Sequence, residues 1–205
     1  MNNMARVITL AHQKGGVGKS TLALNLAYCF QNGLKVGLVD ADLQGSLSGL
    51  QFMVDGINLI NTNDDFATLK EHPFDVILVD TPPYLSNRLP ELFLQSDYIL
   101  VPTKAGFFDL MAIKSTLALI QNSMKEKSAL KAGIVFNMIK GSSSITSEIR
   151  SLTKDFTIPV LKSFVSDRVS FTRSTISGGV LQTTDEKAKL EIIALADEIL
   201  THLGI

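Results

Sequence analysis

Residues 6–21 read RVITLAHQKGGVGKST, an apolar run that passes into glycines and then into a lysine followed by two hydroxyl side chains. The apolar residues between Val7 and Ala11 lie close together without polar alternation, which predicts a buried parallel strand. Beyond the glycines, apolar residues recur at helical spacing from Leu22 to Phe30. The stretch therefore predicts a strand, a glycine-rich loop and a helix in immediate succession.

The glycines of this loop predict a binding site for phosphate. Gly15, Gly16 and Gly18 permit backbone conformations that a Cβ atom would penalise, so several N–H groups can converge on one anion. The amino terminus of the following helix adds free N–H donors and a partial positive charge. Lys19 is placed to reach the β- and γ-phosphates of a nucleotide, and the Ser20 hydroxyl to coordinate Mg²⁺.

The loop departs from the usual phosphate-loop spacing at its start. That spacing places a glycine at position 13, where this chain has Gln13, and a second lysine, Lys14, opens the loop. Residues 14–21, KGGVGKST, resemble the deviant Walker A motif of the ParA/MinD superfamily. The resemblance implies ATP and Mg²⁺ as cofactors, and a homodimer in the ATP state in which Lys14 reaches the nucleotide of the partner subunit. The expected cofactor-binding residues are Gly15, Gly16, Val17, Gly18, Lys19, Ser20 and Thr21. The alternative is a glycine-rich turn with two surface lysines.

Length and composition are those of one α/β domain over residues 1–205. Hydrophobic residues make up 45% and charged residues 19%, which is ordinary for such a protein. The net charge of −1 gives no global attraction to DNA or acidic lipid, so polyanion binding needs a local basic patch. No signal peptide precedes the first strand, and Cys29 alone cannot form an internal disulfide. We therefore expect a cytoplasmic protein.

Acidic residues follow two of the predicted strands, at 35–39 and 74–79. Asp40 and Asp42 project to the same side if the strand geometry continues, so one can hold a metal-bound water while the other orients the attacking water. The segment DADLQGS resembles switch I of the family, which makes Asp42 the water-orienting residue and Asp40 a metal-supporting one. The catalytic residues expected are then Lys14, Lys19 and Asp42. Alternatively, both acids cap the following turn.

The second acidic strand end has the Walker B pattern. VILVD places four apolar residues before Asp80, which would act through a Mg²⁺-bound water, so the expected metal residues are Ser20, Asp40 and Asp80. The following Thr81-Pro82-Pro83 resembles switch II, whose stiff turn can move as one piece. The alternative is a plain turn at a strand end.

The remaining elements alternate between strands and helices. This order predicts a mainly parallel central sheet with helices on both faces, an α/β fold of the P-loop NTPase type. Further strands are expected at 57–60, 98–101, 132–136 and 160–165, and helices at 65–71, within 84–96, and at 110–125, 145–152 and 188–203. The strand at 98–101 is expected to stop at Pro102.

Two further sites are implied by the resemblance. An asparagine at the end of the 132–136 strand helps to read adenine in superfamily members, and Asn137 stands there, although it could instead cap a turn. The segment SDRVSFTRSTISGG resembles the ParA segment in which an arginine-bearing loop and helix follow the last strand. ParA-type proteins bind DNA non-specifically through basic residues of these regions. The DNA-binding candidates are Lys162, Arg168, Arg173, Lys187 and Lys189, with a solvated basic face as the alternative.

The motifs together indicate a ParA-like ATPase for plasmid or chromosome partition, associated with the nucleoid. It would dimerise with ATP, bind non-specific DNA, and be stimulated by a centromere-binding adaptor of the ParB type. A MinD-like positioning role needs a terminal amphipathic helix with a basic polar face, but the terminal helix here carries Glu191, Asp197 and Glu198, so no membrane is expected as a partner. A metabolic enzyme of the dethiobiotin synthetase type is a third possibility, for which no distinctive substrate residues stand out.

Overall fold

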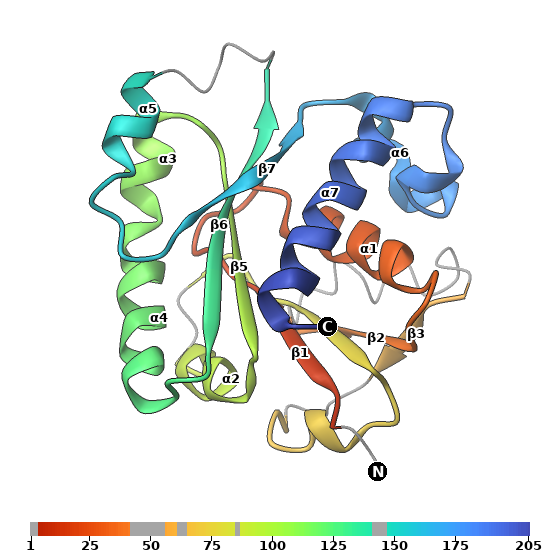
Figure 1. The fold of residues 1–205 in the computed structure, drawn as a ribbon, viewed down its shortest axis with the longest axis horizontal. Coiled ribbons are helices and arrows are strands. Elements are labelled where there is room, and N and C mark those ends of the chain that lie inside the picture. The colour runs from red at the N-terminus through yellow and green to blue at the C-terminus, as the bar shows by residue number, and fades with distance from the viewer. Residues whose placement is uncertain (1–3, 42–55, 61–64, 85–86, 141–146) are drawn as a thin grey trace.

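The protein is an α/β sandwich built on one parallel sheet (Figure 1). This computed structural model describes residues 4–41, 56–60, 65–84, 87–140 and 147–205. Within them, seven strands are hydrogen-bonded in the order β3-β2-β4-β1-β5-β6-β7, and every pair is parallel. The strands are β1 (Arg6–Leu10), β2 (Val36–Asp40), β3 (Asn58–Ile60), β4 (Val76–Asp80), β5 (Tyr98–Thr103), β6 (Lys131–Ile139) and β7 (Val160–Ser166).

Helices cover both faces of the sheet, as the alternating element order predicted. The helices are α1 (Lys19–Phe30), α2 (Leu89–Gln95), α3 (Phe107–Ala112), α4 (Lys114–Glu126), α5 (Ser147–Leu152), α6 (Val169–Ser177) and α7 (Glu186–Leu203), with 3-10 turns η2 (Leu69–Glu71) and η4 (Val180–Gln182). Apolar side chains of α1, α6 and α7 pack on one face, and those of α2, α3 and α4 on the other. Because both faces are buried, the strands read as continuous apolar runs. No helix in the described ranges is long and apolar enough to cross a membrane.

The topological switch point of the sheet lies at its centre, between β1 and β4. β1 and β4 are neighbours, with Leu10 opposite Asp80, yet β1 continues into α1 and β4 into α2, which lie on opposite faces. In such sheets the connections diverge beyond the carboxyl ends of the strands and leave a crevice for a ligand. The glycine-rich loop follows β1 at this edge.

Three predicted boundaries are wrong. β5 runs through Pro102 to Thr103, because β1 pairs with β5 only as far as Leu100 and the strand beyond has a partner on one side only. The helix predicted at 110–125 is two helices, α3 and α4, separated at Ile113. β6 also continues past Phe136, so Asn137 lies within the strand.

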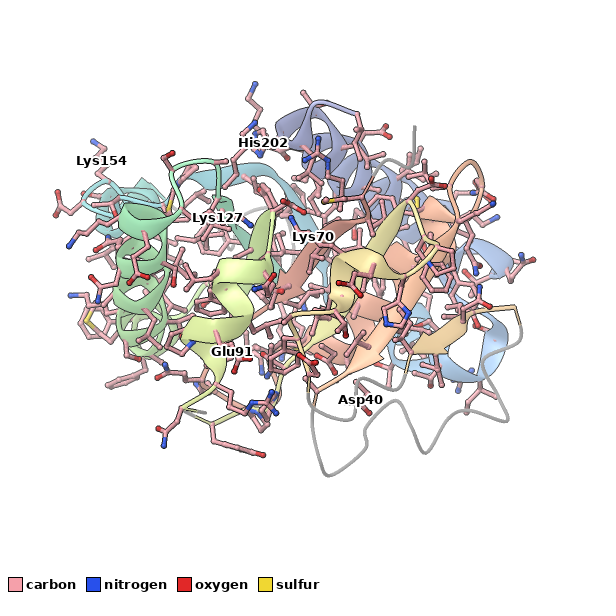
Figure 2. All side chains as sticks on the ribbon, turned by 90° about the horizontal axis from the view of Figure 1, so that it is seen from below. Asp40, Lys70, Glu91, Lys127, Lys154 and His202 are labelled. Atoms are coloured by element: carbon pink, nitrogen blue, oxygen red, sulfur yellow. The ribbon has the colours of Figure 1, made fainter. Side chains whose placement is uncertain are left out.

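A cluster of charges around the buried Asp97 lies at the opposite, amino end of the sheet. Asp97 accepts the Val7 amide hydrogen at 2.9 Å and lies 2.5 Å from Lys70 Nζ and 3.7 Å from Lys127 Nζ. Figure 2 shows Lys70 and Lys127 together, well apart from Asp40 at the end of β2. Burial and the neighbouring Lys70 lower the pKa of Lys127. These charges fasten the start of β5 to β1 and lie at the other end of the sheet from the glycine-rich loop.

Candidate nucleotide-binding site

The loop between β1 and α1 has the backbone that the glycines predicted. Gly16 and Gly18 have φ angles of 69° and 89°, in the left-handed region that favours glycine. Gly18 is also the N-cap of α1, and its carbonyl accepts the Leu22 amide hydrogen at 2.9 Å. A Cβ atom on Gly18 would overlap the side chain of Asn137. Glycine at position 18 is therefore required both by the backbone and by a neighbouring strand.

This loop frames an open cavity of about 270 Å³ at the amino terminus of α1. Its lining consists of Gly15, Gly16, Gly18, Lys19, Ser20, Thr21, Thr81, Pro83 and Met138. Lys19 is buried although its side chain is cationic. Thr81, from the turn after β4, donates a hydrogen bond from Oγ1 to the Leu10 carbonyl at 2.8 Å, so that turn is fastened to the end of β1. A cavity with backbone N–H groups and a lysine fits an anionic phosphate chain.

The oxygen ligands expected for a metal meet beside this cavity. Ser20 Oγ donates to Asp80 Oδ2 at 2.5 Å, and Asp80 is fully buried. Asp40 lies opposite Asp80 in the β2–β4 register, so the two strands bring both carboxylates to one edge. Hydroxyl and carboxylate oxygens suit Mg²⁺, which also retains waters and phosphate oxygens as ligands. In the described part of the chain, no group of three or more His, Cys, Asp or Glu residues could hold a metal. Asp42 lies outside the described residues.

His12 is a buried group of the loop that the sequence motifs did not single out. Its Nδ1 accepts the Lys14 amide hydrogen at 2.8 Å, which leaves the ring hydrogen of the neutral imidazole on Nε2. Burial, with Lys19 and Lys14 nearby, lowers the pKa of His12 to about 4. The side chain is therefore neutral at physiological pH and holds the start of the loop through its nitrogen lone pair.

The two residues at which the loop departs from the usual spacing both contact the α3–α4 segment. Lys14 Nζ lies 2.5 Å from Asp109 Oδ1 on α3, and the Ser115 hydroxyl on α4 donates to Gln13 Oε1 at 2.8 Å. A glycine at position 13 could not form the second contact. Gln13 and Lys14 therefore fasten the outer side of the loop to helices that lie about a hundred residues further along the chain.

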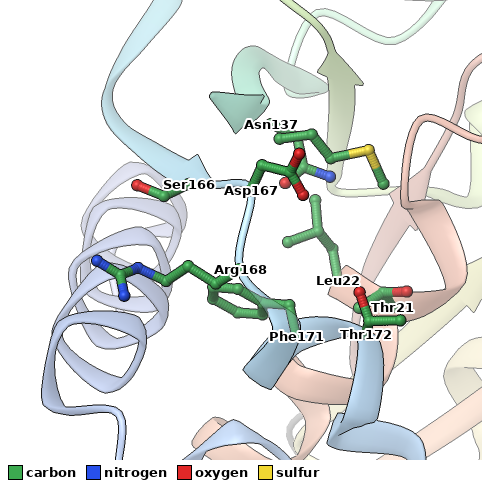
Figure 3. Close-up of a pocket in the computed structure, with 9 residues that line it drawn as sticks. Thr21, Leu22, Asn137, Ser166, Asp167, Arg168, Phe171 and Thr172 are labelled. Atoms are coloured by element: carbon green, nitrogen blue, oxygen red, sulfur yellow. The ribbon is translucent and has the colours of Figure 1, made fainter. Parts of the chain in front are cut away.

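A second pocket, of about 200 Å³, lies beside the loop at the ends of β6 and β7 (Figure 3). Its lining residues are Thr21, Leu22, Asn137, Met138, Ser166, Asp167, Arg168, Phe171 and Thr172. Leu22 and Phe171 provide apolar walls, and Asp167 directs its carboxylate inwards. Met138 has a φ of 55°, and the β6–β7 register shifts on either side of Phe136, so a strand irregularity brings Asn137 to the loop.

Asn137 lines this pocket, but its amide nitrogen already has an acceptor. Nδ2 donates to the Val17 carbonyl at 2.8 Å, which ties β6 to the glycine-rich loop. The amide oxygen is the group that remains for a ligand. The carboxylate of Asp167, which the sequence analysis did not single out, is a second hydrogen-bond acceptor in the same pocket. The only signal in the sequence was its position as a polar residue directly after the last strand, and that position alone does not distinguish a binding residue from one in an ordinary turn.

The five basic candidates for DNA binding do not form one uncompensated patch. Arg168 Nη1 donates to both carboxylate oxygens of Asp185 at 3.1 Å, so this guanidinium fastens α6 to the start of α7. Figure 3 shows Arg168 directed away from the pocket, towards that helix. Lys189 pairs with Glu186 at 2.8 Å. Lys162, Arg173 and Lys187 have exposed side chains.

The sheet order, the strand-loop-helix unit and the buried lysine define a nucleotide-binding protein of the P-loop class. The family model described as the CobQ/CobB/MinD/ParA nucleotide binding domain matches residues 8–181. The chain belongs to this family, and the resemblance predicted from the sequence is confirmed.

Individual proteins and solved structures are similar to this chain as well. Maintenance of carboxysome distribution protein A of Halothiobacillus neapolitanus is 29% identical over 187 residues, which cover 86% of this chain and 87% of that protein. Chromosome-partitioning ATPase Soj of Thermus thermophilus is 31% identical over 153 residues, which cover 57% of this chain and 61% of Soj. Among solved structures, the septum site-determining protein MinD of Pyrococcus horikoshii, complexed with Mg-ADP, matches with a TM-score of 0.69. That match is 22% identical and covers 96% of each chain, so it shows the shared fold.

Proposed function

We propose that this protein is a ParA-type ATPase that binds ATP with Mg²⁺, dimerises in the ATP state and positions DNA. The observation that carries the proposal is the glycine-rich loop, which combines a buried Lys19 with a second lysine, Lys14, at its outer side. A nucleotide in the loop places its phosphates among backbone N–H groups beside Lys19. The cargo would be a plasmid or chromosome, recognised through a centromere-binding adaptor of the ParB type.

The site residues are assigned as follows. The loop from Gly15 to Thr21 holds the phosphates, and the pocket with Asn137 receives the adenine. Ser20, Asp80 and Asp40 hold the metal, which neutralises phosphate charge when it is bound. Asp42 orients the attacking water, and Lys14 reaches the nucleotide of the partner subunit.

Support for the metal assignment comes from the donor set of this chain. The hydrogen bond between Ser20 Oγ and Asp80 Oδ2 brings two oxygen donors together, so the hydroxyl could turn its lone pair to a cation while Asp80 holds a water bound to that cation. The MinD structure with Mg-ADP has the same fold. ATP hydrolysis is further supported by the relationship to Soj, whose name records an ATPase.

DNA binding is assigned to the exposed cations Lys162, Arg173 and Lys187, around α6 and α7. A monomer with a net charge of −1 offers DNA only a local patch. Dimerisation doubles the number of these cations facing the phosphates, so binding to DNA depends on the nucleotide state. The protein would then be associated with the nucleoid in the cytoplasm.

Positioning of a protein cargo is the second candidate function, because one relative maintains the distribution of carboxysomes. A MinD-like membrane role has less support from α7. Its apolar residues Ala188, Ile192 and Leu195 are buried in the core, and Glu198 accepts the backbone amide hydrogens of Lys162 and Ser163. The apolar side of α7 therefore packs against the core and is not exposed for contact with a membrane.

Binding to random-sequence duplex DNA tests the proposal. The purified protein is titrated onto DNA in ATP with Mg²⁺ and in ADP, at several salt concentrations. We expect binding that requires ATP and weakens steeply with salt. A protein that hydrolyses ATP but binds DNA in neither state would exclude DNA positioning and favour a protein cargo. Failure to bind ATP at all would exclude the nucleotide site itself.

A further inference from the structure

The pocket at the ends of β6 and β7 adjoins the phosphate cavity, because Thr21 and Met138 line both. A nucleotide with its phosphates in the glycine-rich loop can therefore extend its base into this pocket. Leu22 and Phe171 form apolar walls against which a flat base can pack (Figure 3). Packing against such walls is similar for every base, so the choice among bases must come from the polar atoms of the pocket.

Two of these polar groups are hydrogen-bond acceptors. The side-chain nitrogen of Asn137 donates to the Val17 carbonyl at 2.8 Å, so the amide oxygen is the atom that can face a ligand. The carboxylate of Asp167 is directed into the pocket, and an ionised carboxylate can only accept. Arg168, a cation in the same lining, donates instead to Asp185.

The backbone holds the Asp167 carboxylate beside the strand that carries Asn137. Asp167 directly follows β7, and its amide donates to the Ile139 carbonyl at the end of β6 at 3.0 Å. Its side chain is about half exposed, and Oδ2 lies 4.0 Å from Nζ of Lys140, whose side chain is 85% exposed. An ion pair this exposed contributes little, so it does not prevent the carboxylate from accepting a hydrogen from a ligand.

We propose that Asp167 selects the base of the nucleotide by accepting a hydrogen from the exocyclic amino group of adenine. This inference rests on the proposed nucleotide site and adds a specificity-determining residue to it. The amino group carries two hydrogens, so the Asn137 oxygen and the Asp167 carboxylate can each accept one. Guanine and hypoxanthine present a carbonyl oxygen at the same position of the ring. Two acceptors would then face a third with no hydrogen between them, and such a mismatch is rejected more strongly than a lost apolar contact.

Isothermal titration calorimetry with ADP and with IDP, both in Mg²⁺, tests this inference. The two nucleotides differ at the position that Asp167 would read, where ADP carries the amino group and IDP the carbonyl oxygen. We expect wild type to bind ADP roughly tenfold or more tightly than IDP. Asp167→Asn should bring the two affinities together or favour IDP, because the new amide can turn its NH₂ group towards the carbonyl oxygen.

Two variants serve as matched controls. Asp155→Asn makes the same chemical change at an exposed side chain in the turn after α5. Lys140→Gln removes the partner of the exposed ion pair and keeps the carboxylate of Asp167. Both should retain the wild-type ratio of the two affinities. A Lys140→Gln protein with the ratio expected for Asp167→Asn would overturn the inference, since the ion pair would then decide the ratio.

The remaining outcomes separate this inference from the proposed function. An Asp167→Asn protein with the wild-type ratio overturns the inference. Equal losses of affinity for both nucleotides in that variant also overturn it, since Asp167 would then only hold the pocket together. A wild-type protein that binds ADP and IDP equally overturns base selection and leaves the phosphate loop standing. A wild-type protein that binds neither overturns the nucleotide site, and the proposed function with it.

Discussion

Lys14 Nζ lies 2.5 Å from Asp109 Oδ1, although the two residues are 95 positions apart in the chain. The second lysine of the loop is thus paired within its own subunit. Reaching the nucleotide of a partner subunit requires this contact to break. In the proposed dimer, Asp109 would therefore compete with the partner's phosphates for the ammonium group of Lys14.

Removing the charge of Asp109 should favour the dimer. Because the Lys14 side chain is 47% exposed, the pair is worth less than about 1 kcal/mol, so Asp109→Asn should tighten AMPPNP-dependent dimerisation by up to about fivefold. Analytical ultracentrifugation measures this constant, with Asp197→Asn on the exposed side of α7 as the control. Weaker dimerisation in Asp109→Asn would show that the carboxylate instead belongs to the interface.

Asp80 should control the part of nucleotide affinity that depends on the metal. Replacing this buried carboxylate by Asp80→Asn removes the charge beside Ser20, and we expect the affinity for ATP in Mg²⁺ to fall about 10- to 100-fold. Affinity in EDTA should change little, since the loop still binds the phosphates. Isothermal titration calorimetry gives both values. The control is Asp75→Asn, just before the other end of β4. An equal loss with and without Mg²⁺ would contradict a metal role.

The two positive-φ glycines of the loop should differ in their tolerance of alanine. Gly16→Ala meets open space, so only the left-handed backbone costs stability, about 1 kcal/mol. Gly18→Ala also displaces Asn137 and disrupts its hydrogen bond to Val17, which adds about 1 kcal/mol or more. Urea unfolding without nucleotide measures both variants. Equal losses would mean that Asn137 moves aside freely.

His12 should make the protein sensitive to acid. The pKa of His12 is about 4 in the folded protein and about 6.5 in the unfolded chain, so the unfolded chain binds the proton more readily. The free energy of unfolding therefore falls as the pH drops from about 6.5 to about 4. The contribution amounts to about 2 to 3 kcal/mol between pH 7 and 4.5. His12→Asn keeps an acceptor for the Lys14 amide but does not titrate.

The comparison is made by urea unfolding of wild type and His12→Asn at pH 7 and pH 4.5. Carboxylates that lose stability in acid do so in both proteins, so the difference between the two losses reports His12 alone. We expect wild type to lose about 2 to 3 kcal/mol more than the variant. Equal losses would mean that His12 is protonated within the folded protein without cost.

Much of the nucleotide site could be predicted from local sequence. The glycines, Lys19 and Ser20 lie within a few residues of one another, and their placement at one loop follows from a strand that turns directly into a helix. Asp80 could be predicted too, because an acid after a buried parallel strand must lie at the edge where the loop also lies. The parallel sheet itself followed from alternating periodicities.

The pairings of individual side chains across the fold could not be predicted. The candidate Arg168 is paired with Asp185, which depends on how α6 meets α7, and Asn137 reaches Val17 through an irregularity in β6 that leaves no clear signal in the sequence. Spacing along the chain determined which segments form strands, helices and the phosphate loop, because those choices depend on neighbours within a few residues. Only the tertiary structure decided that Lys14 is paired with Asp109, because contacts between distant side chains depend on how the helices pack against the sheet.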